Sequence, residues 1–147
     1  MNGRQRAYTF TRIGIAIFFV LHAIAHAPGI LGAWKIVEFE DASFRPNVLL
    51  TDASDTLVAV LGALWLLAAL GYLAAAVGLF RNDQWWRTAT FLAALVSLGM
   101  STLWMEDAIV GLMINIAILT ALFLMNAWWL QRAVDDGRIR PGAPSHA

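Results

Sequence analysis

Residues 13–29 read Ile-Gly-Ile-Ala-Ile-Phe-Phe-Val-Leu-His-Ala-Ile-Ala-His-Ala-Pro-Gly, an apolar run that contains two histidines. Together with the residues that follow as far as Trp34, the run is long enough to cross a bilayer as a helix. His22 and His26 are four residues apart, so they lie on one face of that helix, about 6 Å apart along its axis. Polar side chains inside hydrocarbon are costly, so the pair marks a candidate functional site. Pro28 removes a backbone donor and clashes with the carbonyl of Ile24, which predicts a kink beside His26.

The composition of the 147-residue chain is typical of a membrane protein. Hydrophobic residues make up 60%, charged residues only 14%, and the mean hydropathy is +0.66, whereas soluble domains carry about a quarter charged residues. The chain has no cysteine, which excludes disulfides, thiolate metal ligands and a catalytic thiol. Its formal net charge of zero gives no electrostatic basis for binding nucleic acid.

Four apolar segments predict an all-α protein, an integral membrane four-helix bundle in a single domain over residues 1–147. We expect helices over about residues 13–34, 56–80, 88–105 and 108–131, followed by a mobile tail over 132–147. Residues 35–54 mix charged and apolar side chains, which suits a loop in the headgroup region. Three residues are candidate N-caps of the second helix: Asp52, Ser54 and Asp55. The hydroxyl groups of Ser97, Ser101 and Thr102 can bond back to their own helix.

Basic residues are concentrated on one side of this predicted bundle. With the N-terminus inside, the inner side carries Arg4, Arg6, Arg12, Arg81, Arg87, Arg132, Arg138 and Arg140, and the outer side carries Lys35 and Arg45. Cytoplasmic segments of membrane proteins are enriched in Lys and Arg. The sequence therefore predicts a multi-pass protein of the cell (cytoplasmic) membrane, surrounded by the lipid bilayer, with both termini cytoplasmic.

The predicted fourth helix has one strongly polar residue in its apolar part, Asn115. It shares a helical stripe with Asp107 and Gly111, and the glycine leaves room for a neighbour. Counted from the outer surface, Asn115 and His26 lie at similar depths, whereas His22 lies about 6 Å deeper. We therefore expect His26 and Asn115 to share one polar contact or one ligand.

Three interpretations of these residues stay open. The first is an outward-facing intramembrane polar pocket, formed by His22, His26 and Asn115, that binds a lipophilic small molecule such as a quinone or isoprenoid. Trp65 and Trp104 lie away from the expected interface belts and could form walls of this pocket.

The second interpretation is a divalent metal site in which His22 and His26 are joined by Glu106 and Asp107. The third is a non-catalytic accessory subunit of a larger redox or transport complex, in a homo- or hetero-oligomer, whose polar residues hold helices together. Haem is not expected, because the third histidine, His146, lies in the tail. The sequence does not indicate whether the protein is an enzyme.

Two short motifs resemble those of a group of small, largely uncharacterised bacterial four-helix membrane proteins that are broadly DoxX-like. The first is H-x-x-x-H, present in residues 21–26 (L-H-A-I-A-H) and followed by Gly29. The second is W-x-D-A-x-x-G-x-x-x-N, which resembles residues 104–115 (W-M-E-D-A-I-V-G-L-M-I-N) except for one extra residue before the aspartate. The group's basic residue after Asp-Ala is Ile109 here. The resemblance implies four helices in a bacterial inner membrane, with links to redox or quinone-side complexes, and it assigns no activity.

Overall fold

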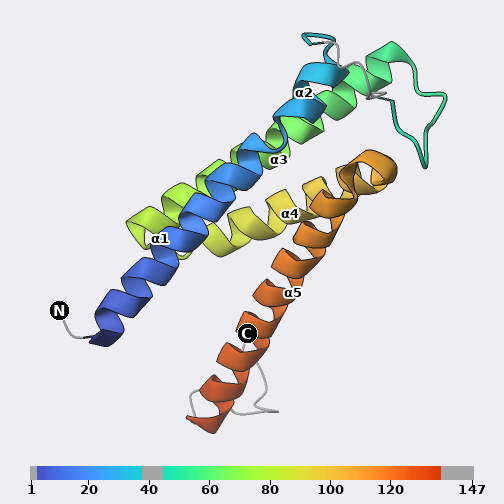
Figure 1. Ribbon diagram of the computed structural model, residues 1–147. Coiled ribbons are helices and arrows are strands. Elements are labelled where there is room, and N and C mark those ends of the chain that lie inside the picture. The colour runs from blue at the N-terminus through green and yellow to red at the C-terminus, as the bar shows by residue number, and fades with distance from the viewer. Residues whose placement is uncertain (1–2, 38–44, 137–147) are drawn as a thin grey trace, which may run out of the picture.

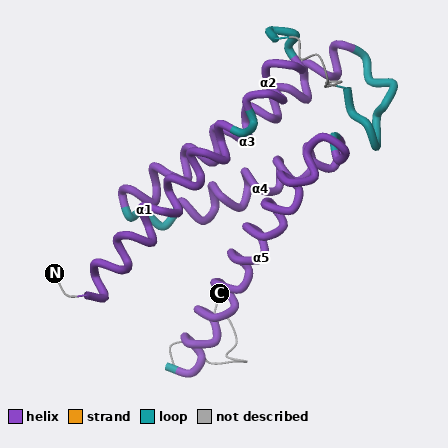
Figure 2. Tube along the Cα trace, in the orientation of Figure 1, coloured by secondary structure: helices purple, strands orange, loops and turns teal. Residues whose placement is uncertain are grey.

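The computed structural model describes residues 3–37 and 45–136, and all regular secondary structure within them is helical (Figure 1; Figure 2). The helices are α1 (Gly3–Ile24), α2 (Ala27–Ala33), α3 (Asp55–Arg81), α4 (Trp86–Leu103) and α5 (Met105–Asp135). Because α1 and α2 are two parts of one interrupted helix, the chain forms four helices, as predicted. Part of the predicted headgroup loop (38–44) and most of the predicted tail, including His146, lie outside the described residues.

The break between α1 and α2 lies where Pro28 predicts it. The α1 helix ends at Ile24, and α2 begins at Ala27 with the proline in its first turn. His26 occupies the N-cap position of α2, and its backbone N–H donates to the carbonyl of Ala23 at 3.1 Å. A proline in the first turn of a helix loses no hydrogen bond, which is why the chain can resume a helix immediately.

The other boundaries differ from the predicted ones mainly at the N-terminus. The α1 helix begins at Gly3 rather than near residue 13, because the leader contains good helix formers and no proline. Ser54 is the N-cap of α3, and its side chain accepts a hydrogen bond from the N–H of Leu57 at 3.3 Å. The first turn of α5 is separated from the rest by non-helical angles at Ala108. The continuous part of α5 therefore begins close to residue 108, where the fourth helix was predicted to begin.

The α3 helix is the centre of the bundle, since it packs against α1, α2 and α4, while α5 packs on α4. Small residues on α3, among them Gly71, Ala75 and Gly78, permit these close approaches. A Cβ atom at Gly71 would lie 2.8 Å from the Cβ of Ala93 in α4, and Ala75 is fully buried. The α5 helix diverges from α1 toward its C-terminal end (Figure 1).

Among the described residues, three helical spans are long and apolar enough to cross a membrane: Gln5–Ala33, Asp55–Arg81 and Met105–Arg132. The α4 helix, which we expected to be a fourth span, has 18 residues and does not qualify. It carries Arg87 and five hydroxyl side chains, at residues 88, 90, 97, 101 and 102. Large apolar side chains cover the outside of the bundle, and Phe123 of α5 is 72% exposed. These features are consistent with a membrane protein.

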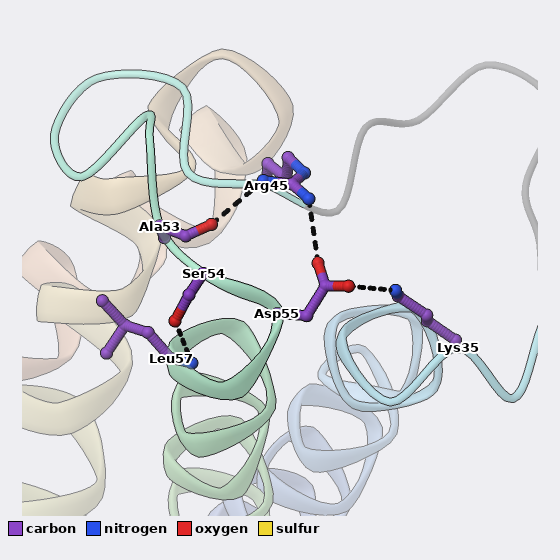
Figure 3. Close-up of polar contacts among 6 residues, drawn as sticks. All are labelled: Lys35, Arg45, Ala53, Ser54, Asp55 and Leu57. Atoms are coloured by element: carbon purple, nitrogen blue, oxygen red, sulfur yellow. Dashed lines mark hydrogen bonds and ion pairs between the residues drawn. The ribbon is translucent and has the colours of Figure 1, made fainter.

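Polar contacts join the end of α2 to the start of α3 (Figure 3). Asp55 accepts from Lys35 at 2.7 Å and from Arg45 at 2.8 Å, and Arg45 also donates to the carbonyl of Ala53. All three charged side chains are exposed, so these ion pairs position the loop without adding much stability. We call this end of the molecule the loop end, and the opposite end, at the α3–α4 connection, the turn end.

Candidate functional site

Asn115 of α5 is the centre of a buried polar network. Its side chain is 0% exposed. The side-chain Nδ2 donates to the carbonyl of Gly111 at 2.7 Å and to the hydroxyl of Ser97 at 2.8 Å. Because a backbone carbonyl can only accept, the contact with Gly111 fixes the orientation of the amide. The Oδ1 atom therefore faces Tyr72 of α3 and His22 of α1. It accepts from the Tyr72 hydroxyl, and His22 Nε2 lies 3.5 Å away.

His26 extends this network from the break between α1 and α2. Its Nδ1 lies 2.7 Å from the carbonyl oxygen of His22, so Nδ1 carries the proton and donates. In the neutral ring, Nε2 is then an acceptor, and the Ser97 hydroxyl donates to it at 2.8 Å. Ser97 thus accepts from Asn115 and donates to His26. Five side chains, from α1, α3, α4, α5 and the break, form one network in which every residue has a partner: His22, His26, Tyr72, Ser97 and Asn115.

His26 and Asn115, which we expected to share one polar contact or one ligand, make no direct hydrogen bond to each other. Ser97 lies between them, and His22, predicted to be too deep, is the histidine that reaches Asn115. The depth comparison assumed one continuous helix through residue 26, whereas the chain leaves the helix after Ile24. In addition, α5 packs on α4, so a residue of α4 is placed between the two.

Sequence reasoning missed Tyr72 and Ser97. Tyr72 was not identified as a candidate, although a buried tyrosine hydroxyl requires a hydrogen-bond partner. That requirement, in a helix with no other polar side chain between Trp65 and Arg81, was the available signal. Ser97 was expected to bond back to its own helix, as Thr102 does to the carbonyl of Leu98 at 2.8 Å.

A cavity of about 510 Å³ lies beside the network, toward the loop end. Residues of all five helices or their junctions surround it: His22, Ala25, His26, Pro28, Gly29, Trp65, Ser97, Ser101, Trp104, Asp107, Ala108, Val110, Gly111 and Ile114. Both tryptophans predicted to be walls therefore line the cavity, and their rings are 6.1 Å apart at 59°. Asn115 does not line the cavity, but its side chain contacts those of His22 and Ser97, which do.

Ser101 is the unusual member of the cavity wall. Its side chain is 1% exposed, and its hydroxyl has no hydrogen-bond partner in the described part of the chain. The hydroxyl faces α5, because a Cβ atom added at Gly111 would lie 3.3 Å from it. An unpaired buried hydroxyl costs about 1–3 kcal/mol, so a hydrogen bond from the Ser101 hydroxyl to a bound molecule would relieve this cost.

The four predicted metal ligands are not brought together. Within residues 3–37 and 45–136, no group of three or more histidine, aspartate or glutamate side chains is placed to hold a metal ion. Asp107 lines the cavity and accepts from Asn47 at 3.2 Å, whereas Glu106 contacts the same asparagine through its backbone N–H. Both ring nitrogens of His26 are already used in hydrogen bonds. Two imidazoles one turn apart can serve the protein's own polar groups as well as a metal ion, so their spacing alone does not indicate a metal site.

Searches of protein-family models, of curated proteins and of solved structures found no match to this chain. The resemblance to DoxX-like proteins therefore stays a prediction from two motifs. Residues of the second motif do gather at the site: Asp107 and Gly111 line the cavity, and Asn115 is the centre of the network.

Proposed function

We propose that the protein is a multi-pass protein of the cell membrane whose cavity binds a lipophilic small molecule that accepts a hydrogen bond from Ser101. A quinone, or an isoprenoid that carries an oxygen, has this chemistry. The observation that carries the proposal is the unpaired Ser101 hydroxyl in the wall of a 510 Å³ cavity.

The size and lining of the cavity support this proposal. Ligand pockets typically measure about 300–1,000 Å³ and combine apolar walls with a few polar groups that orient the ligand. Here, Trp65 and Trp104 supply flat apolar surface, and His22 and His26 form a polar edge whose rings meet at right angles, 5.0 Å apart. The proposal includes no chemical step, because both nitrogens of His26 are occupied by hydrogen bonds.

The distribution of charge supports a membrane location with both termini cytoplasmic. Arg12, Arg81 and Arg87 lie at the turn end, whereas Lys35 and Arg45 lie at the loop end. With the basic turn end on the cytoplasmic side, the cavity, which lies toward the loop end, would be in the outer half of the bilayer.

Binding of ubiquinone-1 to the full chain in detergent tests the proposal. Quenching of tryptophan fluorescence reports binding, since Trp65 and Trp104 line the cavity. We expect saturable quenching in the natural protein and about tenfold weaker binding in Ser101→Ala, the loss of one hydrogen bond. Thr102→Ala is the matched control, because that neighbouring hydroxyl bonds to its own helix, and its affinity should not change. Farnesol, an isoprenoid alcohol, tests the second ligand class.

Two results would overturn the proposal. One is the absence of saturable binding by both ubiquinone-1 and farnesol. The other is equal affinity in Ser101→Ala and the natural protein, which would show that the unpaired hydroxyl does not contact the ligand. Gly111→Leu adds a check, because its side chain would fill the cavity beside Ser101 and should abolish binding.

A second candidate function, a non-catalytic accessory subunit, is favoured by the network itself. All five side chains of the network are satisfied within the chain, as expected for residues that hold helices together. The exposed apolar surface of α5, including Phe123, provides an area for a partner helix. Native mass spectrometry of protein extracted gently from its source membrane would detect such a partner. A partner bound in a fixed ratio, with no small molecule, would favour this function.

A further inference from the structure

A second cavity, of about 220 Å³, lies at the turn end and shares no lining residue with the cavity described above. It is formed by the N-terminal half of α1, the end of α3, the α3–α4 connection, the start of α4 and one residue of α5. Its polar lining includes Tyr8, Arg12, Asn82 and Arg87, and its apolar lining includes Trp86 and Met125. Two arginines from different helices therefore line one partly open cavity.

Neither arginine has a carboxylate partner among the described residues. The Nε atoms of Arg12 and Arg87 are shielded from solvent and make no hydrogen bond. The nearest interactions are with aromatic rings: the Arg12 guanidinium lies 5.9 Å from the centre of Tyr8, and that of Arg87 lies 5.7 Å from Trp86. Arg81, at the same end of the molecule, is different, because it pairs with Asp83 at 3.1 Å.

Shielded donors on a charged group are costly when they are unpaired. A carboxylate from this chain could relieve that cost, but the Asp83 carboxylate is already bonded to Arg81 and Trp85. An incoming anion is the alternative. Guanidinium groups bind phosphate through paired N–H donors, and the several oxygens of a phosphate can serve two guanidiniums at once.

We propose that the turn-end cavity binds a phosphate group between Arg12 and Arg87. A phospholipid headgroup and free phosphate share this chemistry. The apolar wall around Trp86 and Met125 favours the phospholipid, since tryptophan is enriched at headgroup depth. The inference is independent of the ligand of Ser101, and only the choice of a phospholipid depends on the proposed membrane location.

The test is a native mass spectrometry titration of delipidated full-length protein in a nonionic detergent. The probes are dioleoylphosphatidylglycerol, dioleoylglycerol, which has the same chains without phosphate, and inorganic phosphate. We expect the phosphatidylglycerol to bind and the dioleoylglycerol not to bind. Arg12→Gln and Arg87→Gln should each weaken binding about tenfold, because each removes charge-assisted hydrogen bonds to the phosphate. Arg81→Gln is the matched control and should bind like the natural protein.

The other outcomes are also decisive. Inorganic phosphate that binds tightly and needs both arginines would support the phosphate site and assign it to the free anion. Equal binding of dioleoylglycerol, unchanged binding in both Gln variants, or an equal loss in Arg81→Gln would overturn the proposal. If a Gln variant does not fold, Arg12→Lys and Arg87→Lys keep the charge but lose the paired donors, and affinities below that of the natural protein are expected. Ser101→Ala should leave this binding unchanged, so the two proposals fail separately.

Discussion

Ser97 and Ser101 lie one turn apart on α4, and both side chains are 1% exposed, yet their hydroxyl groups have opposite surroundings. Ser97 accepts from Asn115, donates to His26 and thereby joins α5 to the α1–α2 break. Ser101 lines a cavity, and its hydroxyl has no partner among the residues that the structure describes. Two serines with the same burial therefore differ in whether their hydroxyl groups have hydrogen-bond partners.

The three arginines at the turn end, Arg12, Arg81 and Arg87, show the same contrast. Arg81 has a carboxylate partner and is mostly exposed, whereas the shielded Nε atoms of Arg12 and Arg87 have no partner within residues 3–37 and 45–136. In both cavities, the unpaired group lies beside apolar and aromatic walls. We therefore expect a larger loss in the free energy of unfolding when a hydrogen-bonded polar side chain is removed than when an unpaired one is removed.

The largest expected effect comes from removing the centre of the satisfied network. Asn115→Leu leaves Tyr72, His22 and Ser97 without a shared partner, and we expect a loss of about 2–4 kcal/mol in the free energy of unfolding. Thermal or denaturant unfolding in detergent measures it. Asn126→Leu, the same change at an exposed position of the same helix, should cost much less. Equal losses in the two variants would mean that the network does not stabilise the bundle.

The helices could be predicted from the sequence because hydrophobic runs of this length have few alternatives. The all-helical fold, the four helices and the break beside His26 are confirmed. The early start of α1 was missed, because the predicted start followed apolar character, and a polar helical extension has no such signal. The apolar character of α4 was overestimated, since its hydroxyl residues lower its hydropathy. Membrane insertion and the orientation of the termini stay predictions.

The site could be predicted only in part. His22, His26 and Asn115 were identified because strongly polar residues are conspicuous in apolar helices, and they do come together. Their exact partners depended on which helices pack against each other, and no pattern in the sequence gives that order. Tyr72 and Ser97 were missed for this reason. Of the two acidic residues of the predicted metal site, Asp107 accepts from Asn47 through its carboxylate, and Glu106 donates to Asn47 through its backbone N–H.

The next effect compares the two serines directly. Ser97→Ala leaves a donor of Asn115 and an acceptor of His26 unpaired, so we expect a loss of about 1–2 kcal/mol in the free energy of unfolding. Ser101→Ala removes a hydroxyl that has no partner to lose, so its change should stay within about 0.5 kcal/mol and could be stabilising. The same unfolding experiment measures both variants. A larger loss for Ser101→Ala than for Ser97→Ala would contradict the assigned hydrogen bonds.

The smallest effect is the coupling between His26 and Asn115, which Ser97 should transmit. A double-mutant cycle with His26→Leu and Asn115→Leu should give a coupling of about 0.5–1.5 kcal/mol, because either change already breaks the chain of hydrogen bonds. Repeated in a Ser97→Ala background, the coupling should fall to within about 0.3 kcal/mol of zero. The cycle between His22 and Asn115 serves as the control, since those side chains approach each other directly at 3.5 Å. Its coupling should survive the loss of Ser97. If the His26–Asn115 coupling persisted without Ser97, the two side chains would have to interact directly or through the backbone, and Ser97 would not be the link between α5 and the α1–α2 break.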